Sequence, residues 1–148
     1  MLAGDVLSDC FVPRLEKFVR RDGAWQLVSE PMFKGYFFVA TRDMGTLSEE
    51  LAKLSWHVPV AGRGPQGYAH LSDEVRCFLA NALDGNHVLR ASEGVIEDGE
   101  LAVSRGPLRG RERSVRKINR HKRMAWLGVS EGSDACVLRA ALNVSAKS

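Results

Sequence analysis

Cysteine is scarce in this 148-residue chain, and its three cysteines lie far apart. Cys10, Cys77 and Cys136 form no Cys-x-x-Cys pair, and no pair of histidines lies near them. An odd number of distant cysteines disfavours a disulfide framework, and their spacing disfavours a zinc site. We therefore expect a chain that holds neither a metal ion nor a cofactor.

The sequence also lacks the motifs of common catalytic centres. It contains no Gly-x-x-x-x-Gly-Lys-[Ser/Thr] phosphate loop and no His-Glu-x-x-His zinc motif, and no nucleophile has a supporting histidine. Glu112 and His121 could in principle act as acid and base, but both stand in a basic segment. That setting favours a surface role, with Glu112 paired to a neighbouring arginine. These absences predict a protein that is not an enzyme.

Long apolar runs are missing as well. No stretch reaches about 18 apolar residues, the length that a helix needs to cross a bilayer. The first residues include Asp5 and Asp9 and no basic leader. We therefore expect a cytoplasmic protein. Its 148 residues suit one ordinary domain or two small ones.

Positive charge is plentiful, and it is concentrated toward one end. Residues 1–94 carry 10 Lys and Arg against 12 Asp and Glu, a net −2, whereas residues 95–148 carry 11 against 6, a net +5. Between Ser104 and Arg123, nine basic residues accompany one acid, Glu112. This density favours a polyanionic partner through counterion release, and a solvated charged face is the alternative.

The first part of the chain predicts strands and helices in alternation. Cys10–Pro13 is typical of a short strand that stops at proline, and Asp22-Gly23 between apolar runs predicts a hairpin with a type I′ turn. The apolar run Met32–Ala40 predicts a central strand with a bend or bulge at its glycine.

Two helices are expected after this strand. Thr46 and Glu49 form a capping box before apolar residues at helical spacing. Ser72 is expected to cap a second helix that ends at Asp84-Gly85. The buried face of this second helix should hold Val75, Phe78, Leu79, Ala82 and Leu83.

Helical periodicity disappears after about residue 92. His87–Ala91 predicts one strand, and later segments separated by glycines are typical of a small antiparallel barrel. Its strands are expected over Glu100–Ser104, Ser114–Ile118, Arg123–Val129 and Ala135–Val144. Because the charge changes at nearly the same place, the sequence predicts two domains, residues 1–92 and residues 98–148, with a linker at 93–97.

Several segments resemble motifs of NusG-like transcription factors. Val103–Glu112 contains Gly-Pro-Leu-Arg-Gly and resembles the KOW motif, in which a strand runs into a Gly-Pro-hydrophobic-basic-Gly turn. Met32–Val39 resembles a strand of the NusG N-terminal domain, called NGN. Within the family, Ser92–Ile96 and Arg116–Arg123 look like the LoaP class of specialised paralogs.

The resemblance implies an α+β fold, with an NGN-like antiparallel sheet and flanking helices followed by a five-stranded, SH3-like KOW barrel. The first strand and helix of the usual NGN domain are expected to be missing. The family's NGN domain binds the clamp helices of the largest RNA polymerase subunit, and the matching positions here are Phe33, Tyr36 and Phe38. The family's LoaP class binds an RNA hairpin of the nascent transcript, and the matching basic residues are Arg105, Arg109, Arg111, Arg113, Arg116, Lys117, Arg120, His121, Lys122 and Arg123.

By this resemblance we expect a monomeric factor that promotes antitermination in particular operons, with a barrel that keeps its β-structure. Two other interpretations stay open. One is a general NusG elongation factor whose KOW domain binds protein partners. The other is a ribosome-associated or rRNA-binding protein with an SH3-like barrel.

Overall fold

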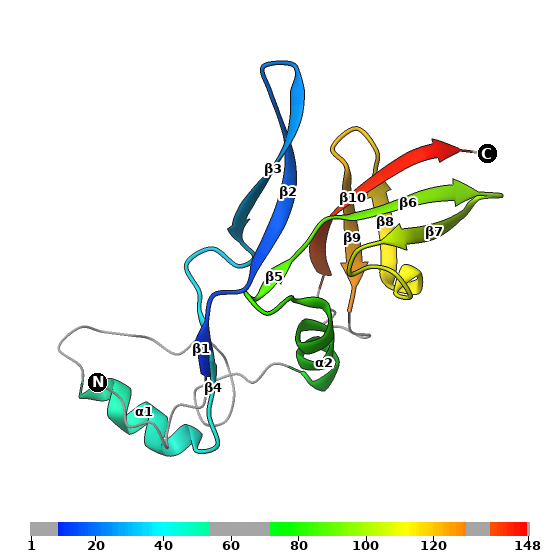
Figure 1. Ribbon diagram of the computed structural model, residues 1–148. Coiled ribbons are helices and arrows are strands. Elements are labelled where there is room, and N and C mark those ends of the chain that lie inside the picture. Colours follow the sequence, from blue (N-terminus) through cyan, green and yellow to red (C-terminus); the bar gives the residue numbers. More distant parts are fainter. Residues whose placement is uncertain (1–8, 54–71, 130–136, 148) are drawn as a thin grey trace. The chain divides into compact units, whose positions relative to one another are not determined.

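The computed structural model describes residues 9–53, 72–129 and 137–147 of the chain (Figure 1). The chain forms two compact units that do not follow its linear order. The first unit comprises Met1–Val12 and Gly35–Leu71, and the second comprises Pro13–Lys34 and Ser72–Ser148. Residues 13–34 therefore belong to the same unit as the basic C-terminal part of the chain.

The described part of the first unit contains a short ribbon and one helix. β1 (Asp9–Phe11) pairs antiparallel with β4 (Phe38–Ala40), and the rings of Phe11 and Phe38 meet edge-on with centroids 5.9 Å apart. A strand at the predicted position of β1 is thereby confirmed. α1 (Met44–Ala52) follows.

The helix α1 begins one turn earlier than its sequence motif predicts. Its N-cap is Asp43, whose carboxylate accepts a hydrogen bond from the Thr46 backbone amide at 3.0 Å. The predicted cap at Thr46 is wrong because the Asp43 carboxylate already satisfies an amide of the first turn. The helix buries Leu47.

The predicted central strand Met32–Ala40 is wrong for most of its length. Only its last three residues form a strand, β4, and Gly35 lies in a turn with φ of +83°. A positive φ takes the backbone out of the extended region, so the apolar run cannot continue as a single strand. Tyr36 and Phe37, which follow the turn, are 56% and 48% exposed.

The second unit starts with a long hairpin. β2 (Arg14–Arg21) pairs antiparallel with β3 (Ala24–Pro31) through a turn at Asp22 and Gly23, whose φ angles are +52° and +77°. The predicted type I′ hairpin is therefore confirmed. β5 (Val88–Leu89) pairs parallel with β2 and completes the sheet order β3-β2-β5.

The helix α2 (Asp73–Ala82) is close to its prediction. The Ser72 hydroxyl accepts a hydrogen bond from the Val75 amide at 3.3 Å, which confirms the predicted cap. Four predicted core residues are buried, Val75, Phe78, Leu79 and Ala82, whereas Leu83 is the half-buried C-cap. Within the described ranges, no helix is long and apolar enough to cross a membrane.

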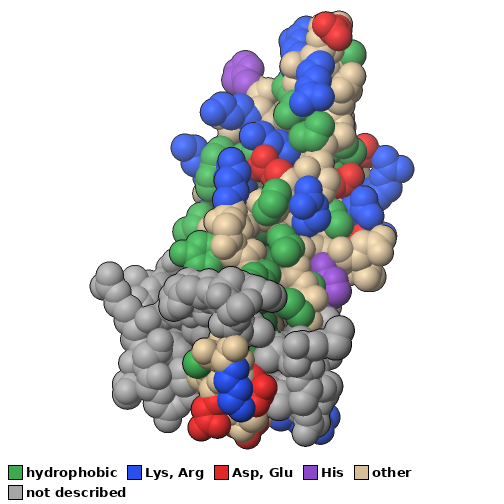
Figure 2. All heavy atoms as spheres, turned by 90° about the vertical axis from the view of Figure 1, so that its left-hand side faces the viewer, with side chains coloured by type: hydrophobic (Ala, Val, Ile, Leu, Met, Phe, Trp, Pro, Cys, Tyr) green, Lys and Arg blue, Asp and Glu red, His purple; other side chains and the backbone are tan. Residues whose placement is uncertain are grey.

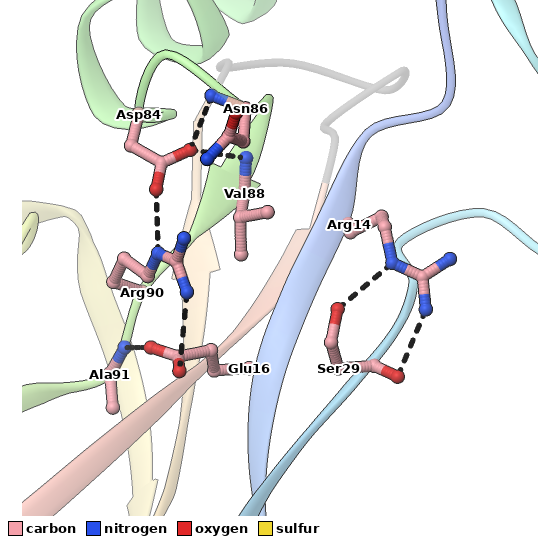
Figure 3. A network of polar contacts seen from close by, with 8 residues as sticks. All are labelled: Arg14, Glu16, Ser29, Asp84, Asn86, Val88, Arg90 and Ala91. Atoms are coloured by element: carbon pink, nitrogen blue, oxygen red, sulfur yellow. Dashed lines mark hydrogen bonds and ion pairs between the residues drawn. The ribbon is translucent and has the colours of Figure 1, made fainter.

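A polar network attaches β2 to the segment after α2 (Figure 3). The Asp84 carboxylate accepts hydrogen bonds from Arg90 Nε at 2.6 Å and from the Val88 amide at 3.0 Å. The hydrogen bond from Arg90 is the main reason that the pKa of Asp84 lies below its ordinary value. Glu16 on β2 accepts from the Ala91 amide at 2.8 Å and lies 3.7 Å from the Arg90 guanidinium.

A curled five-stranded sheet makes up the rest of the second unit (Figure 1). Its order is β7-β6-β10-β9-β8, antiparallel except for the parallel pair β6 and β10. The strands are β6 (Ser92–Glu97), β7 (Glu100–Arg105), β8 (Val115–Asn119), β9 (Met124–Gly128) and β10 (Val137–Lys147). The chain is therefore α+β, and this sheet is compatible with a small SH3-like barrel.

The sheet matches the four strands that the sequence predicts and adds β6. Residues 93–97, expected as a linker, lie in this strand, where they pair with β7 on one side and β10 on the other. The division of the chain into domains at this point stays a prediction.

The turn after β7 is held closely against the start of β6. Gly106 has φ of +104°, and a Cβ placed on it would lie 2.5 Å from Ser92 Oγ and 2.7 Å from the Ala91 carbonyl oxygen. Ser92 is fully buried, and its hydroxyl accepts a hydrogen bond from the Leu108 amide at 3.1 Å. Leu108 is also fully buried. The Gly-Pro-Leu turn is thus anchored by one close backbone approach and one core side chain.

We predict that Gly106→Ala destabilises the protein more than Gly110→Ala does. Both positions have a positive φ, but a Cβ on Gly110 would meet nothing within 4 Å. Strain alone should cost about 1–2 kcal/mol at Gly110, and overlap with Ser92 should add about 1–3 kcal/mol at Gly106. Urea unfolding of both full-length variants measures the difference. Equal destabilisation by the two substitutions would contradict the close approach.

Candidate nucleic-acid interface

The basic residues predicted to bind RNA lie in two consecutive segments of the second unit. One segment is the end of β7, the turn that follows and the 3-10 helix η1 (Glu112–Ser114). The other is β8 with the loop that joins it to β9. Because η1 leads directly into β8, the two segments form one continuous run of chain.

Most of these side chains are exposed, and few have an acidic partner. Only Arg111 and Arg123 are half-buried. Of the ten predicted residues, Arg105 alone has an ion pair in the described part of the chain, with Glu93 at 2.8 Å. We define the basic cluster as the six exposed Lys and Arg residues without such a pair, Arg109, Arg113, Arg116, Lys117, Arg120 and Lys122.

An irregularity in β8 turns two consecutive charges to one face of the sheet. The register of β8 against β9 shifts between Val115 and Lys117. Lys117 pairs with Trp126, with its Nζ 5.3 Å from the ring centroid, and a Cβ on Gly128 would lie 2.6 Å from Arg116 Nε. Residues two apart on a strand share a face. Arg116 and Lys117 therefore both lie over the Trp126 face of β9.

Trp126 is a candidate binding residue that was not identified from the sequence. It is half-buried, and it pairs in register with Lys117 on β8 and with Arg139 on β10. Cross-strand partners lie on the same face of a sheet, so this ring lies between two positive side chains. The alternation of Trp126 with buried Ala125 and Leu127 was the available signal for its outward position.

The loop between β8 and β9 presents the remaining charges. Asn119 ends β8, and its side-chain carbonyl accepts a hydrogen bond from the Lys122 amide at 2.9 Å. The Arg123 amide donates to the Arg120 carbonyl at 3.3 Å and closes the turn. The hairpin tip is therefore residues 120–123, and Arg120, His121 and Lys122 are exposed on it.

Arg123 differs from its neighbours in the loop because it packs against aromatic rings. Its guanidinium carbon lies 4.4 Å from the centroid of Trp25 and 5.5 Å from that of Phe18. These two rings, on β3 and β2, meet edge-on at 6.5 Å. A guanidinium at this range from a ring is attracted by the quadrupole of the ring. Arg123 thus attaches the β8–β9 loop to the β2–β3 hairpin.

Glu112, the one acid within the basic segment, forms hydrogen bonds with the backbone. Its Oε1 accepts from the Val103 amide on β7 at 3.2 Å. Its pKa lies below the ordinary value, chiefly because of its own backbone amide, with smaller contributions from the amides of Val103 and Gly110 and from the charge of Arg109. The expected ion pair with an arginine is not found among the described residues. Glu112 holds η1 to β7.

The three residues expected to contact RNA polymerase differ in exposure and in the unit to which they belong. Tyr36 and Phe38 belong to the first unit, and Phe33 belongs to the second. Tyr36 is 56% exposed, whereas Phe33 is half-buried, and half-buried Phe38 packs against Phe11. Phe37, which was not selected from the sequence, is 48% exposed. Polymerase binding by these residues stays a prediction.

No group of three or more His, Cys, Asp or Glu side chains that could hold a metal ion occurs in the ranges that the structure describes. Cys10 and Cys77 are exposed, and Cys136 lies outside those ranges.

A scan against protein-family models and a search of curated proteins find no match.

We predict that Arg123→Ala destabilises the protein and that Lys122→Ala does not. Removal of the stacked guanidinium should lower the free energy of unfolding by about 1–2 kcal/mol. Removal of the exposed Lys122 side chain should change it by no more than about 0.5 kcal/mol. Urea unfolding of the two variants makes the comparison. If both behave like the unmodified protein, the stack does not stabilise the fold.

Proposed function

We propose that this protein binds RNA through the basic cluster, as a NusG-like transcription antitermination factor. The observation that supports this most strongly is the gathering of exposed positive charge, free of ion pairs among the described residues, on β8 and its adjoining turns. A polyanion that binds there releases condensed counterions, which favours association.

The kinds of side chain in the basic cluster favour an RNA-binding role over that of a charged face that contacts only solvent. Four of the six residues of the basic cluster are arginines, whose planar guanidinium can bind phosphate through two hydrogen bonds and can stack on bases. Trp126 adds a partly exposed ring beside Lys117 and Arg116. Aromatic rings next to basic side chains are a common means of holding unpaired bases. A solvated face usually alternates charges of both signs.

RNA polymerase is the second partner in this proposal. The resemblance of Met32–Val39 to an NGN strand supports it, with exposed Tyr36 as the main contact. An exposed aromatic ring can bury a large area in an interface at a small entropic cost. One chain that holds both polymerase and its emerging transcript gains effective concentration at each contact. The consequence would be reduced termination over particular operons.

The test is a titration of the full chain with a fluorescently labelled RNA hairpin at several salt concentrations. One variant replaces Arg116, Lys117, Arg120 and Lys122 with alanine. Its matched control replaces four exposed basic residues elsewhere, Lys34, Arg42, Lys53 and Arg76, and so changes the net charge equally.

We expect the first variant to bind at least about tenfold more weakly, because each phosphate that the protein neutralises contributes to counterion release. The slope of log affinity against log salt should fall by about one for each basic side chain that no longer meets a phosphate. The control should stay close to the unmodified protein. Equal weakening of both variants, or no measurable binding by the unmodified chain, would refute an RNA-binding role for the basic cluster.

A further inference from the structure

The β2–β3 hairpin brings a second set of basic side chains next to the β8–β9 loop. Arg20 and Arg21 are exposed at the end of β2, beside the turn. Arg20 is directly opposite Trp25 in the strand register, so both side chains lie on one face of the hairpin. The Trp25 ring lies 4.4 Å from the guanidinium carbon of Arg123. Arg20 and the β8–β9 loop therefore flank the same indole ring.

These charges lie on two segments joined by the contact of Arg123 with Trp25, and none of them has an acidic partner among the described residues. Neither Arg20 nor Arg21 has an ion pair among the residues that the structure describes, and the same holds for Arg120 and Lys122 in the loop. Asp22, in the hairpin turn, is exposed and likewise has no ion pair within those ranges. Figure 2, which looks onto the hairpin side, shows Lys and Arg side chains on both sides of it. Like charges gathered in this way favour a bound polyanion.

Two contacts hold the hairpin in place beside the sheet. One is the stack of Arg123 on Trp25 and Phe18. The other is an ion pair between Glu30 on β3 and Arg139 on β10, with 3.7 Å between their charged atoms. Because one contact lies near each end of β3, the hairpin is fixed relative to β9 and β10, which presents its charges in a defined position.

We propose that the end of the β2–β3 hairpin and the loop residues 120–122 form one surface that binds the phosphate backbone of a paired RNA stem. In this surface Trp25 and Arg123 are positioning residues, because they hold the two charged segments together. The indole already contacts Arg123 and is half-buried, so the surface offers charge and hydrogen-bond donors more than a free ring. Such a surface recognises the backbone and not the base sequence.

The inference rests on the proposed RNA binding and extends it from the sheet to the hairpin. Its first test compares Arg20→Ala/Arg21→Ala with the matched control Arg42→Ala/Arg76→Ala in the full chain. The probe is a blunt RNA duplex of arbitrary sequence. We expect the hairpin variant to bind about three- to tenfold more weakly and its salt slope to fall by about two, one for each charge removed. Affinity and slope equal to those of the control would overturn the proposal.

The second test examines the positioning role of the indole. Trp25→Leu keeps every charge but removes the nearer of the two rings that Arg123 contacts, and Trp25→Phe keeps a ring at this position. We expect Trp25→Leu to bind the duplex more weakly and Trp25→Phe to bind it with an affinity close to that of the unmodified chain. Both affinities are measured on protein whose circular dichroism matches that of the unmodified chain. If Trp25→Leu fails to fold, the variant with Arg20 and Arg21 replaced decides whether the hairpin belongs to the binding surface. Unchanged affinity in folded Trp25→Leu would exclude a positioning role.

The outcomes separate this inference from the proposed function. If the unmodified chain binds no RNA, both fail. If substitution in the basic cluster weakens duplex binding whereas substitution of Arg20 and Arg21 does not, RNA binding stands and the hairpin is not part of the surface. Weaker binding by both variants, each effect larger than that of its control, supports the combined surface.

Discussion

The stack of Arg123 on Trp25 and Phe18 is the contact on which the arrangement of the basic surface depends. It joins the first hairpin of the chain to a loop near its other end. Among the described residues, the partners of this guanidinium are aromatic rings and not a carboxylate. A ring face attracts a cation without carrying a net charge. The contact therefore fixes the loop while leaving the positive charge around it undiminished.

The neighbouring elements are held mainly through hydrogen bonds to backbone amides and close backbone contacts. Glu112, the only acid in the basic segment, directs its carboxylate to backbone amides, which lowers its pKa and attaches η1 to β7. Buried Ser92 and the close approach of Gly106 hold the preceding turn. The register shift in β8, between Val115 and Lys117, then directs Arg116 and Lys117 to the Trp126 face. Local geometry thus exposes charge that a typical surface would neutralise.

Local signals in the sequence predicted some of the local structure and missed other parts. Asp22-Gly23 predicted the first hairpin because its turn needs two positive φ angles. The same dipeptide at Asp98-Gly99, with φ of +50° and +81°, joins β6 to β7, yet residues 93–97 were expected as a linker. The turn at Gly35 divided a run whose composition alone favoured one strand.

Contacts between segments far apart in the chain could not be predicted from the sequence. The parallel pairing of β6 with β10 has no local signature, because register across a sheet depends on segments far apart in the chain. For the same reason, the spacing of basic residues identified the exposed cluster but could not distinguish Arg123, which packs on Trp25, from Lys122 beside it. The exposure of each charge is a property of the fold.

An NMR titration of the isotopically labelled full chain with an RNA hairpin tests the proposed RNA surface most directly. We predict that the backbone amide signals of residues 116–122 and 20–21 move as RNA is added, and that those of α2 stay in place. Signals that move only in α1 or α2, or no movement at RNA concentrations that saturate binding, would contradict the proposed surface.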